Sequence, residues 1–154
     1  MDFKIIVPQK ESDFDETISL LDSIFSEYPG ARPYSSKIAF ERTINHDPLI
    51  LEVRLNKQLI AFALCYSRYP HYYHIWELGV DKNYRKQGIA TQIYEITENY
   101  AHKNNYSGTS LNTFNEYTDN LRLVLKRNYI IYDIDKSGEF EKRPKIMLRK
   151  EFNK

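Results

Sequence analysis

Apolar residues recur at every second position in several short segments, which predicts β-strands. These strands are expected at Phe3–Val7, in a hairpin over Leu49–Tyr66 that turns at Asn56-Lys57, and at Tyr72–Val80, Gly108–Phe114, Tyr129–Ile134 and Lys145–Phe152. The paired turn residues and the even alternation on either side are typical of a two-stranded antiparallel unit. A polar loop, Asp135–Pro144, is expected between the last two strands.

Apolar spacings of three and four residues predict helices between these strands. The first carries Phe14, Ile18, Leu21 and Phe25, with Asp13 and Glu16 resembling a capping box at its start and Pro29-Gly30 as its stop. The second starts at Ser35 or Ser36 and stops at His46-Asp47-Pro48; the third, which is the longest, carries Ile89, Ile93, Ile96 and Tyr100. A fourth carries Leu121, Val124 and Leu125 and ends near Asn128, a residue type that tolerates the left-handed conformation.

This order of elements predicts an α/β (α+β) fold with a mixed central sheet. Six to seven strands would be joined by hairpins early in the chain and by helices later, with about four helices flanking the sheet. The chain has 154 residues and no internal repeat or linker, so we expect one domain over residues 1–154.

Charge and composition exclude several classes of protein. Twenty-two Lys plus Arg against 21 Asp plus Glu give a net charge of +1, which argues against a nucleic-acid partner. One cysteine excludes an internal disulfide framework and a thiolate-rich zinc site, so no metal is expected. The apolar run at Phe3–Val7 is too short for a signal peptide, and no segment approaches the roughly 18 apolar residues of a membrane span. We therefore expect a reduced, cytoplasmic protein with no membrane partner.

The segment Trp76–Gln92 carries the most specific chemical pattern, because an apolar strand leads through a basic, glycine-containing turn into the longest helix. A helix start offers unpaired N–H groups to an anion, and Gly88 would let a phosphate approach the backbone closely. Ala90 is also small, and Arg85 and Lys86 add positive charge. The same arrangement occurs in proteins without a ligand, and it is neither a Walker loop nor a dinucleotide fingerprint.

The hexapeptide Arg85-Lys86-Gln87-Gly88-Ile89-Ala90 resembles the Arg/Gln-x-x-Gly-x-Gly/Ala signature of the GNAT superfamily of acyl-CoA-dependent N-acetyltransferases. The resemblance implies a sheet splayed open between the strands ending at Val80 and Phe114, with acetyl-CoA as co-substrate in the opening. Its pantetheine would pair with the backbone of Leu78, Gly79 and Val80, and its pyrophosphate would bind the amides of Gln87, Gly88, Ile89, Ala90 and Thr91. For Gly79, packing beneath a helix is the alternative.

The chain departs from this family at the tyrosine that protonates the departing CoA thiolate, because that position falls on Val124. Three explanations stay open: the register differs, Tyr117 or another tyrosine substitutes, or no acid is used. A thiol with a pKa of about 8.5 leaves readily enough for the last option. Asn115 and Asn120 are further candidate CoA contacts by position, with helix capping or solvent exposure as the alternative.

The implied mechanism is direct transfer of acetyl to an amine in a ternary complex. Glu77 is the candidate general base, acting directly or through water, and a backbone N–H near Leu78 would stabilise the charge that develops on the thioester oxygen. Strict alternation would place Glu77 on the face opposite Trp76 and Leu78. An ion pair or a position at a sheet edge is the alternative for Glu77.

Other candidate residues carry weaker signals. Cys65 lies in an apolar run and is expected to be a small buried residue, and His71 and His74 make a poor metal pair. In the family the region between the first two helices covers the acceptor side. The residues that could line an acceptor pocket there, or simply pack, are Tyr28, Arg32, Tyr34 and Tyr66.

The leading hypothesis is therefore an acetyltransferase acting on a primary amine. The rival is a non-catalytic acyl-CoA-binding domain, which the missing tyrosine at Val124 keeps open. A nucleic-acid-binding module has little support. Homodimers are common in the family, so a homodimer is one expected assembly, and the acceptor is not identified by the sequence.

Overall fold

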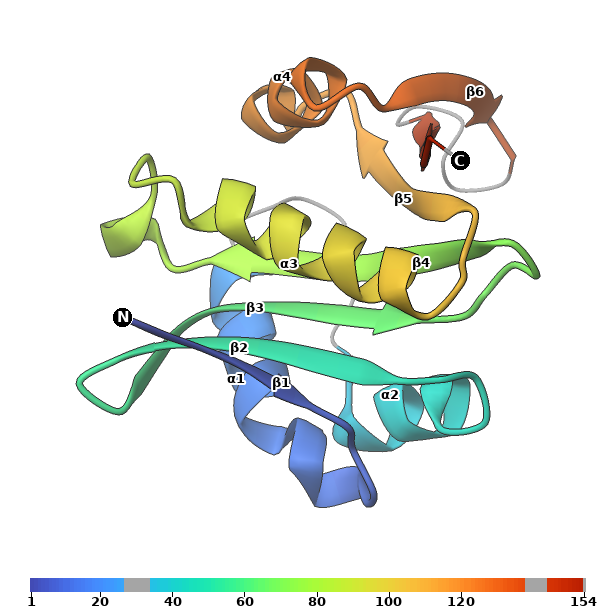
Figure 1. Ribbon diagram of the computed structural model, residues 1–154. Helices are drawn as coiled ribbons and strands as arrows, with labels where there is room; N and C mark the ends of the chain where they lie inside the picture. Colours follow the sequence, from blue (N-terminus) through green and yellow to red (C-terminus); the bar gives the residue numbers. More distant parts are fainter. Residues whose placement is uncertain (27–33, 138–143, 154) are drawn as a thin grey trace.

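The computed structural model describes residues 1–26, 34–137 and 144–153 (Figure 1). The strands are β1 (Asp2–Ile6), β2 (Leu49–Leu55), β3 (Gln58–Tyr66), β4 (Tyr72–Val80), β5 (Gly108–Phe114), β6 (Ile130–Asp135) and β7 (Lys145–Glu151). The helices are α1 (Asp15–Phe25), α2 (Ser36–Thr43), α3 (Ile89–Lys103) and α4 (Thr118–Lys126), with short 3-10 helices η1 (Glu11–Phe14) and η2 (Lys82–Tyr84). The predicted mixed α/β fold is confirmed.

The seven strands form one sheet in the order β1-β2-β3-β4-β5-β7-β6. Among the strand pairs of the described residues, β4 and β5 alone run parallel, and the other neighbours are antiparallel. The β2–β3 hairpin turns where expected, because Asn56 and Lys57 have φ angles of 50° and 70°. Two successive positive φ angles match the right-handed twist of the flanking strands.

Helices cover both faces of the sheet (Figure 1). On one face, Ile89, Ile93 and Tyr94 of α3 and Val124 of α4 join a buried cluster with residues of β2 to β5 and β7. On the other face, residues of η1, α1 and α2 pack over β2 and β3, with Phe14, Leu21 and Phe62 nearly inaccessible to solvent. None of the helices in the described ranges combines the length and the apolar character needed to cross a bilayer.

The sheet opens between β4 and β5, as expected. The two strands pair only where Tyr72–Ile75 runs beside Gly108–Leu111. Beyond these residues β4 continues to Val80 and β5 to Phe114, and within the described residues the two segments share no further strand pairing. The two strands therefore diverge and leave a V-shaped opening between them, which we call the V. Because both strands run in the same direction, the V opens at their carboxyl ends.

A buried ion network holds the β5 side of the V against α3. The Glu98 carboxylate on α3 accepts hydrogen bonds of 2.8 Å from Arg127, at the end of α4, and of 2.8 Å from Lys150 on β7. Tyr129 donates to the same carboxylate at 3.2 Å. Buried charges are tolerated only when they are paired in this way, so the network ties both α4 and β7 to α3.

The start of the first helix was predicted incorrectly. Asp13 does not cap α1 with Glu16; its Oδ2 accepts hydrogen bonds from the backbone N–H groups of Gln9 (2.8 Å) and Lys10 (3.1 Å) and so caps η1. Glu16 instead pairs with Arg54 at 2.6 Å. A carboxylate near a helix start can bond several nearby amides, and the distant Arg54 on β2 decides how Glu16 is used. The expected stop at Pro29-Gly30 lies outside the described residues.

Other helix ends follow local chemistry and match the expectation. Ser35 Oγ accepts a hydrogen bond from the N–H of Ile38 at 3.1 Å, which caps the start of α2. After α4, Asn128 adopts a left-handed φ of 71°.

Candidate active site

The start of α3 is shaped as an anion site. Gly88 is its N-cap residue with φ 80°, and no side chain from the described part of the chain caps the helix there. A Cβ built on Gly88 would meet no described atom within 4 Å, so the space above it is open. The first amides of the helix, those of Ile89, Ala90 and Thr91, have no partner within the helix by its geometry. The side chain of Ile89 itself is buried in the core.

The basic turn before Gly88 is bonded back to β4. Arg85 Nε donates a hydrogen bond of 3.0 Å to the carbonyl oxygen of Val80, which anchors the turn on the last residue of the strand. Arg85, Lys86 and Gln87 are all exposed, and Lys86 adopts a left-handed φ of 62°. The positive side chains therefore stand at the mouth of the V, next to the start of α3.

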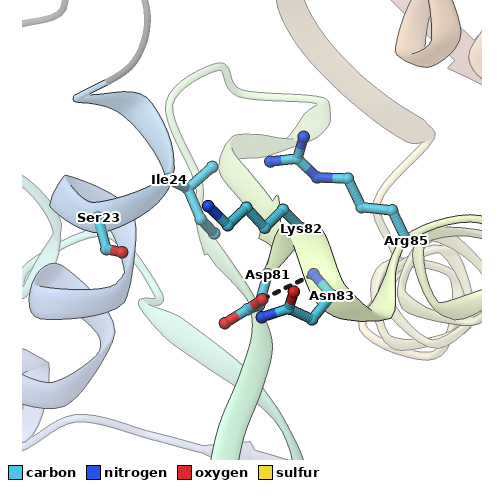
Figure 2. Close-up of a pocket in the computed structure, with 6 residues that line it drawn as sticks. All are labelled: Ser23, Ile24, Asp81, Lys82, Asn83 and Arg85. Carbon is cyan, nitrogen blue, oxygen red and sulfur yellow. Dashed lines mark hydrogen bonds between the residues drawn. The ribbon is translucent and has the colours of Figure 1, made fainter.

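Beside this turn lies a pocket of about 260 Å³. Figure 2 shows its lining, in which the side chains of Lys82 and Arg85 extend toward the end of α1; the lining residues are Ser23, Ile24, Asp81, Lys82, Asn83 and Arg85. Asp81 Oδ1 accepts from the N–H of Asn83 at 2.9 Å and stabilises the turn. Lys82 was missed by the sequence analysis, although a third basic residue in the same turn was the available signal.

Gly79 is explained by packing. A Cβ at this position would lie 2.8 Å from Cε1 of Phe62 and 2.9 Å from Cδ1 of Ile24 on α1. Neighbouring Leu78 and Val80 pack against the buried cluster under α3, on the opposite face of the sheet. The absence of a side chain at Gly79 therefore lets α1 approach β4, and this is the alternative that the sequence analysis left open.

The geometry around Glu77 differs from the expected alternation. Leu64 pairs with Glu77, but Cys65 pairs with Ile75, so Trp76 is an extra residue in β4. Tyr34 packs edge-on against Trp76, with ring centroids 5.4 Å apart, and its hydroxyl is near enough to Glu77 to lower the pKa of that carboxyl group. Glu77 therefore lies on the face of the sheet opposite to that of Leu78, as expected. Contrary to expectation, it shares its face with Trp76. The bulge interrupts the alternation of side chains between the two faces of the sheet, so the side chains of Trp76 and Glu77 both point to one face.

Glu77 has the titration behaviour of a candidate base. Burial raises the pKa of its carboxyl group from 4.5 to about 7, an effect that the Tyr34 hydrogen bond and the charges of Arg42 and Lys145 only partly oppose. A carboxyl group with a pKa near the working pH is suited to proton transfer. Glu77 lies on the half of β4 that pairs with β3 but not with β5, and this half forms one wall of the V.

Two residues of the expected acceptor pocket lie near Glu77. Tyr34 and Tyr66 both pack edge-on against Trp76, with the Tyr66 ring centroid 5.9 Å from it. Tyr28 and Arg32 lie outside the described residues. The structure thus brings two of the four expected residues to one side of the sheet, next to the candidate base.

Tyr117 lies at the end of the opposite wall. It immediately precedes α4, and its half-buried ring packs against Phe114 at 5.8 Å and against Phe25 at 6.3 Å between centroids. Val124, at the family's usual tyrosine position, is fully buried in the core and offers no acid. Tyr117 is thus placed at the carboxyl end of β5, where the V is widest.

Asn115 and Asn120 differ in their surroundings. Asn115 is exposed beside the end of β5. Asn120 Oδ1 accepts a hydrogen bond of 2.9 Å from the hydroxyl of Tyr94, which ties α4 to α3. The contact gives Asn120 a structural role that does not require a ligand.

Cys65 and His74 are buried. Cys65 is 1% exposed, as expected of a small core residue, and burial raises the pKa of its thiol to about 12. His74 Nδ1 lies 2.9 Å from Ser110 Oγ, and burial lowers the pKa of its ring to about 3. His71 precedes β4 and is exposed. A neutral thiol and a neutral imidazole at these positions are suited to packing and hydrogen bonding.

Several solved structures share this fold. The ribosomal-protein-S18-alanine N-acetyltransferase from Escherichia coli is 14% identical, with 96% of this chain and 92% of that chain covered and a TM-score of 0.77. A GNAT family acetyltransferase from Elizabethkingia anophelis with acetyl-CoA bound is 17% identical, with 97% and 98% covered and a TM-score of 0.69. The IAA acetyltransferase from Bacillus cereus is 19% identical, with 98% and 100% covered and a TM-score of 0.75.

These low identities establish the fold, and the family is established by sequence. No curated protein matches the sequence of this chain. The model of the acetyltransferase (GNAT) family, however, matches residues 15–129, a range that includes β4, the basic turn, α3, Tyr117 and α4. The chain therefore belongs to the GNAT acetyltransferase family.

Proposed function

We propose that this protein transfers an acetyl group from acetyl-CoA directly to a primary amine within a ternary complex. The observation that carries the proposal is the position of Glu77 beside the V, with a carboxyl pKa raised to about 7. Membership of the family supports acyl transfer as the reaction class.

The residues around the V fit acetyl-CoA as co-substrate. The open space at Gly88 and the uncapped start of α3 suit a pyrophosphate, which would bind the amides of residues 87 to 91, while Arg85, Lys86 and Lys82 supply positive charge. The backbone of Leu78 to Val80 is free of β5 and would pair with the pantetheine. Acetyl-CoA supplies the activated acetyl thioester. Its presence in the Elizabethkingia anophelis structure supports this assignment.

Glu77 acts as the general base. An aliphatic amine is mostly protonated near pH 7 and must lose a proton before it can attack a carbonyl carbon. The Glu77 carboxylate accepts this proton, directly or through one water molecule. A pKa of about 7 means that a substantial fraction of Glu77 is ionised at neutral pH, yet it remains basic enough to accept the proton.

Leu78 and Tyr117 act on the negative charges that develop on the thioester oxygen and on the departing sulfur. The backbone N–H near Leu78 donates a hydrogen bond to the thioester oxygen as negative charge develops there. The Tyr117 hydroxyl gives its proton to the departing sulfur. Because a thiol is already a fair leaving group, we expect this acid to contribute less than the base does.

A second candidate function is acyl-CoA binding without turnover. The buried Val124 favours it, because the family's usual acid is absent from that position. Incubating the protein with acetyl-CoA and a panel of primary amines, and measuring released CoA and acetylated amine together, separates the two functions. Amine-dependent release supports the transferase. Acetyl-CoA binding by calorimetry without turnover supports the binding domain, and the absence of both overturns the two proposals.

Other properties of the protein stay predictions. These are a single domain over residues 1–154, a cytoplasmic location, a homodimer, the lack of a nucleic-acid or membrane partner, and the lack of a metal.

A further inference from the structure

A continuous row of aromatic rings lies beside the candidate base. From Tyr34 through Trp76, Tyr66 and His74 to Tyr69, successive ring centroids are 5.4, 5.9, 5.9 and 5.6 Å apart. Each pair meets nearly at right angles, between 79° and 90°. Such edge-to-face packing is favourable, so the row forms a rigid wall rather than a set of independent side chains.

Two guanidinium groups lie over rings of this row. The Cζ atom of Arg42 on α2 lies 4.5 Å from the centroid of the Trp76 ring, and that of Arg68 lies 5.3 Å from the centroid of the Tyr69 ring. Both arginines are exposed. Burial raises the pKa of the Tyr66 hydroxyl, and the charges of Arg68 and Arg42 both oppose that rise, so both cations lie near Tyr66.

Within the described part of the chain neither guanidinium forms an ion pair or a hydrogen bond with a carboxylate, although the charge of Arg42 lowers the pKa of Glu77. Other arginines contrast with this pair, since Arg54 binds Glu16 at 2.6 Å and Arg127 binds Glu98 at 2.8 Å. A guanidinium over an aromatic ring leaves N–H groups available to an anion, and the guanidinium fork can bind a carboxylate or phosphate bidentately.

The charges along the row are complementary to one class of molecule. Glu77, which lies near Tyr34 at one end of the row, attracts a protonated amine, whereas Arg42 and Arg68 attract an anion. A simple amine would use only the first of these features and would be repelled by the two arginines. An acceptor with both charges would use all of them.

We infer that the acceptor is a small amine that also carries a carboxylate or phosphate group, bound beside the aromatic row with its amine toward Glu77 and its anion attracted by the charges of Arg42 and Arg68. This inference rests on the proposed acetyl transfer and names the chemical class of its acceptor. Transfer converts the ammonium group into a neutral amide, so the product keeps only the negative charge.

The experiment uses acceptor pairs that differ only in the anion: phenylalanine and phenethylamine, tyrosine and tyramine, and phosphoethanolamine and ethanolamine. The first two pairs test a carboxylate and the third tests a phosphate. The value of kcat/KM is measured for the full chain and for the variants Arg42→Gln and Arg68→Gln. Arg122→Gln, which changes an exposed arginine on α4, is the matched control. Comparing each variant with wild type for the same acceptor cancels the different intrinsic basicities of the amines.

We expect the anionic member of at least one pair to be preferred. Arg42→Gln and Arg68→Gln should each lower its kcat/KM by about tenfold to a hundredfold relative to that of the neutral member of the same pair, because any change in the base Glu77 affects both members alike. Arg122→Gln should match wild type for every acceptor. A preference for the neutral amines, or equal losses for both members of each pair, would overturn the inference while leaving acetyl transfer intact.

If none of the acceptors is acetylated, the binding of the acceptors tests the inference. Calorimetry of the same pairs on the CoA-loaded protein should then show that the anionic member binds more tightly, and equal binding or none overturns the inference. A protein that binds neither CoA nor acetyl-CoA overturns the proposed function itself.

Discussion

The ring of Tyr117 packs against the ring of Phe25, with centroids 6.3 Å apart, and this contact joins the end of α1 to the start of α4. The neighbour of Phe25, Ile24, lies against Gly79 near the end of β4, whereas Tyr117 follows the end of β5. The contact therefore links the two walls of the V near their carboxyl ends. It places the Tyr117 ring close to both walls of the V.

Tyr117→Phe tests whether this hydroxyl acts as the acid. The variant keeps the ring and its contacts with Phe25 and Phe114 but cannot donate a proton. We expect kcat to fall by roughly tenfold to a hundredfold, at the low end of general acid–base effects because the thiol leaves readily. Tyr132→Phe, which changes an exposed tyrosine on β6, is the control. A wild-type kcat for Tyr117→Phe would show that no acid is supplied from this position.

Glu77→Gln tests the base. The base must be ionised to accept a proton, so kcat/KM of wild type should rise with pH through about 7, the raised pKa of Glu77. The glutamine variant should lose about 10²-fold to 10⁴-fold at neutral pH and recover partly at high pH, where free amine is abundant. Acetyl-CoA affinity should stay near wild type, and Glu41→Gln on α2 should behave as wild type throughout. An unchanged pH profile would remove Glu77 from the mechanism; a parallel loss of acetyl-CoA binding would make it structural.

The same variant should change the pH dependence of stability. Glu77 titrates near 4.5 in the unfolded chain and near 7 in the folded protein, so between these values the folded state holds the proton more tightly. Wild-type stability therefore falls as pH rises through this window, relative to a variant that does not titrate. We therefore compare the melting temperature of Glu77→Gln minus that of wild type at two pH values. We expect this difference to be a few degrees larger at pH 8 than at pH 4.5. Equal differences at both pH values would contradict the raised pKa.

Substitutions at Gly88 test the anion site at the start of α3. Valine there should destabilise the fold by about 1–2 kcal/mol, because φ is 80°. It should also cost about 2 kcal/mol of CoA-binding free energy, which raises the Kd of CoA more than tenfold. Asparagine tolerates the left-handed conformation, so Gly88→Asn should keep the melting temperature and still weaken binding through its bulk. CoA affinity within about threefold of wild type for a folded Gly88→Asn would place the pyrophosphate elsewhere.

Gly79→Ala separates packing from ligand contact. The added Cβ would meet Phe62 and Ile24 at less than 3 Å, so we expect a loss of about 1–3 kcal/mol in the free energy of unfolding. CoA affinity should change little, because the new methyl group points toward α1. Denaturant unfolding and calorimetry measure the two effects. A stable variant with much weaker CoA binding would show that Gly79 is kept for the ligand.

Local pattern determined much of this molecule. The bounds of β4 and β5 were predicted without error, and the turn at Asn56-Lys57 and the stop at Asn128 depend on conformations that single residues favour. The basic glycine turn from Arg85 to Ala90 also identified the family, because its spacing reflects the local geometry of a strand leading into a helix.

The tertiary structure alone decided how the site is assembled. The β4 bulge at Trp76 depends on register with β3, and it brings Trp76, Glu77 and Tyr34 together where strict alternation separates the first two. The contacts of Gly79 with Phe62 and Ile24, like the pairing of Glu16 with Arg54, join segments far apart in sequence. A single chain's pattern records each residue's own preference, whereas strand register, burial and the pKa of Glu77 depend on partners that only folding brings near.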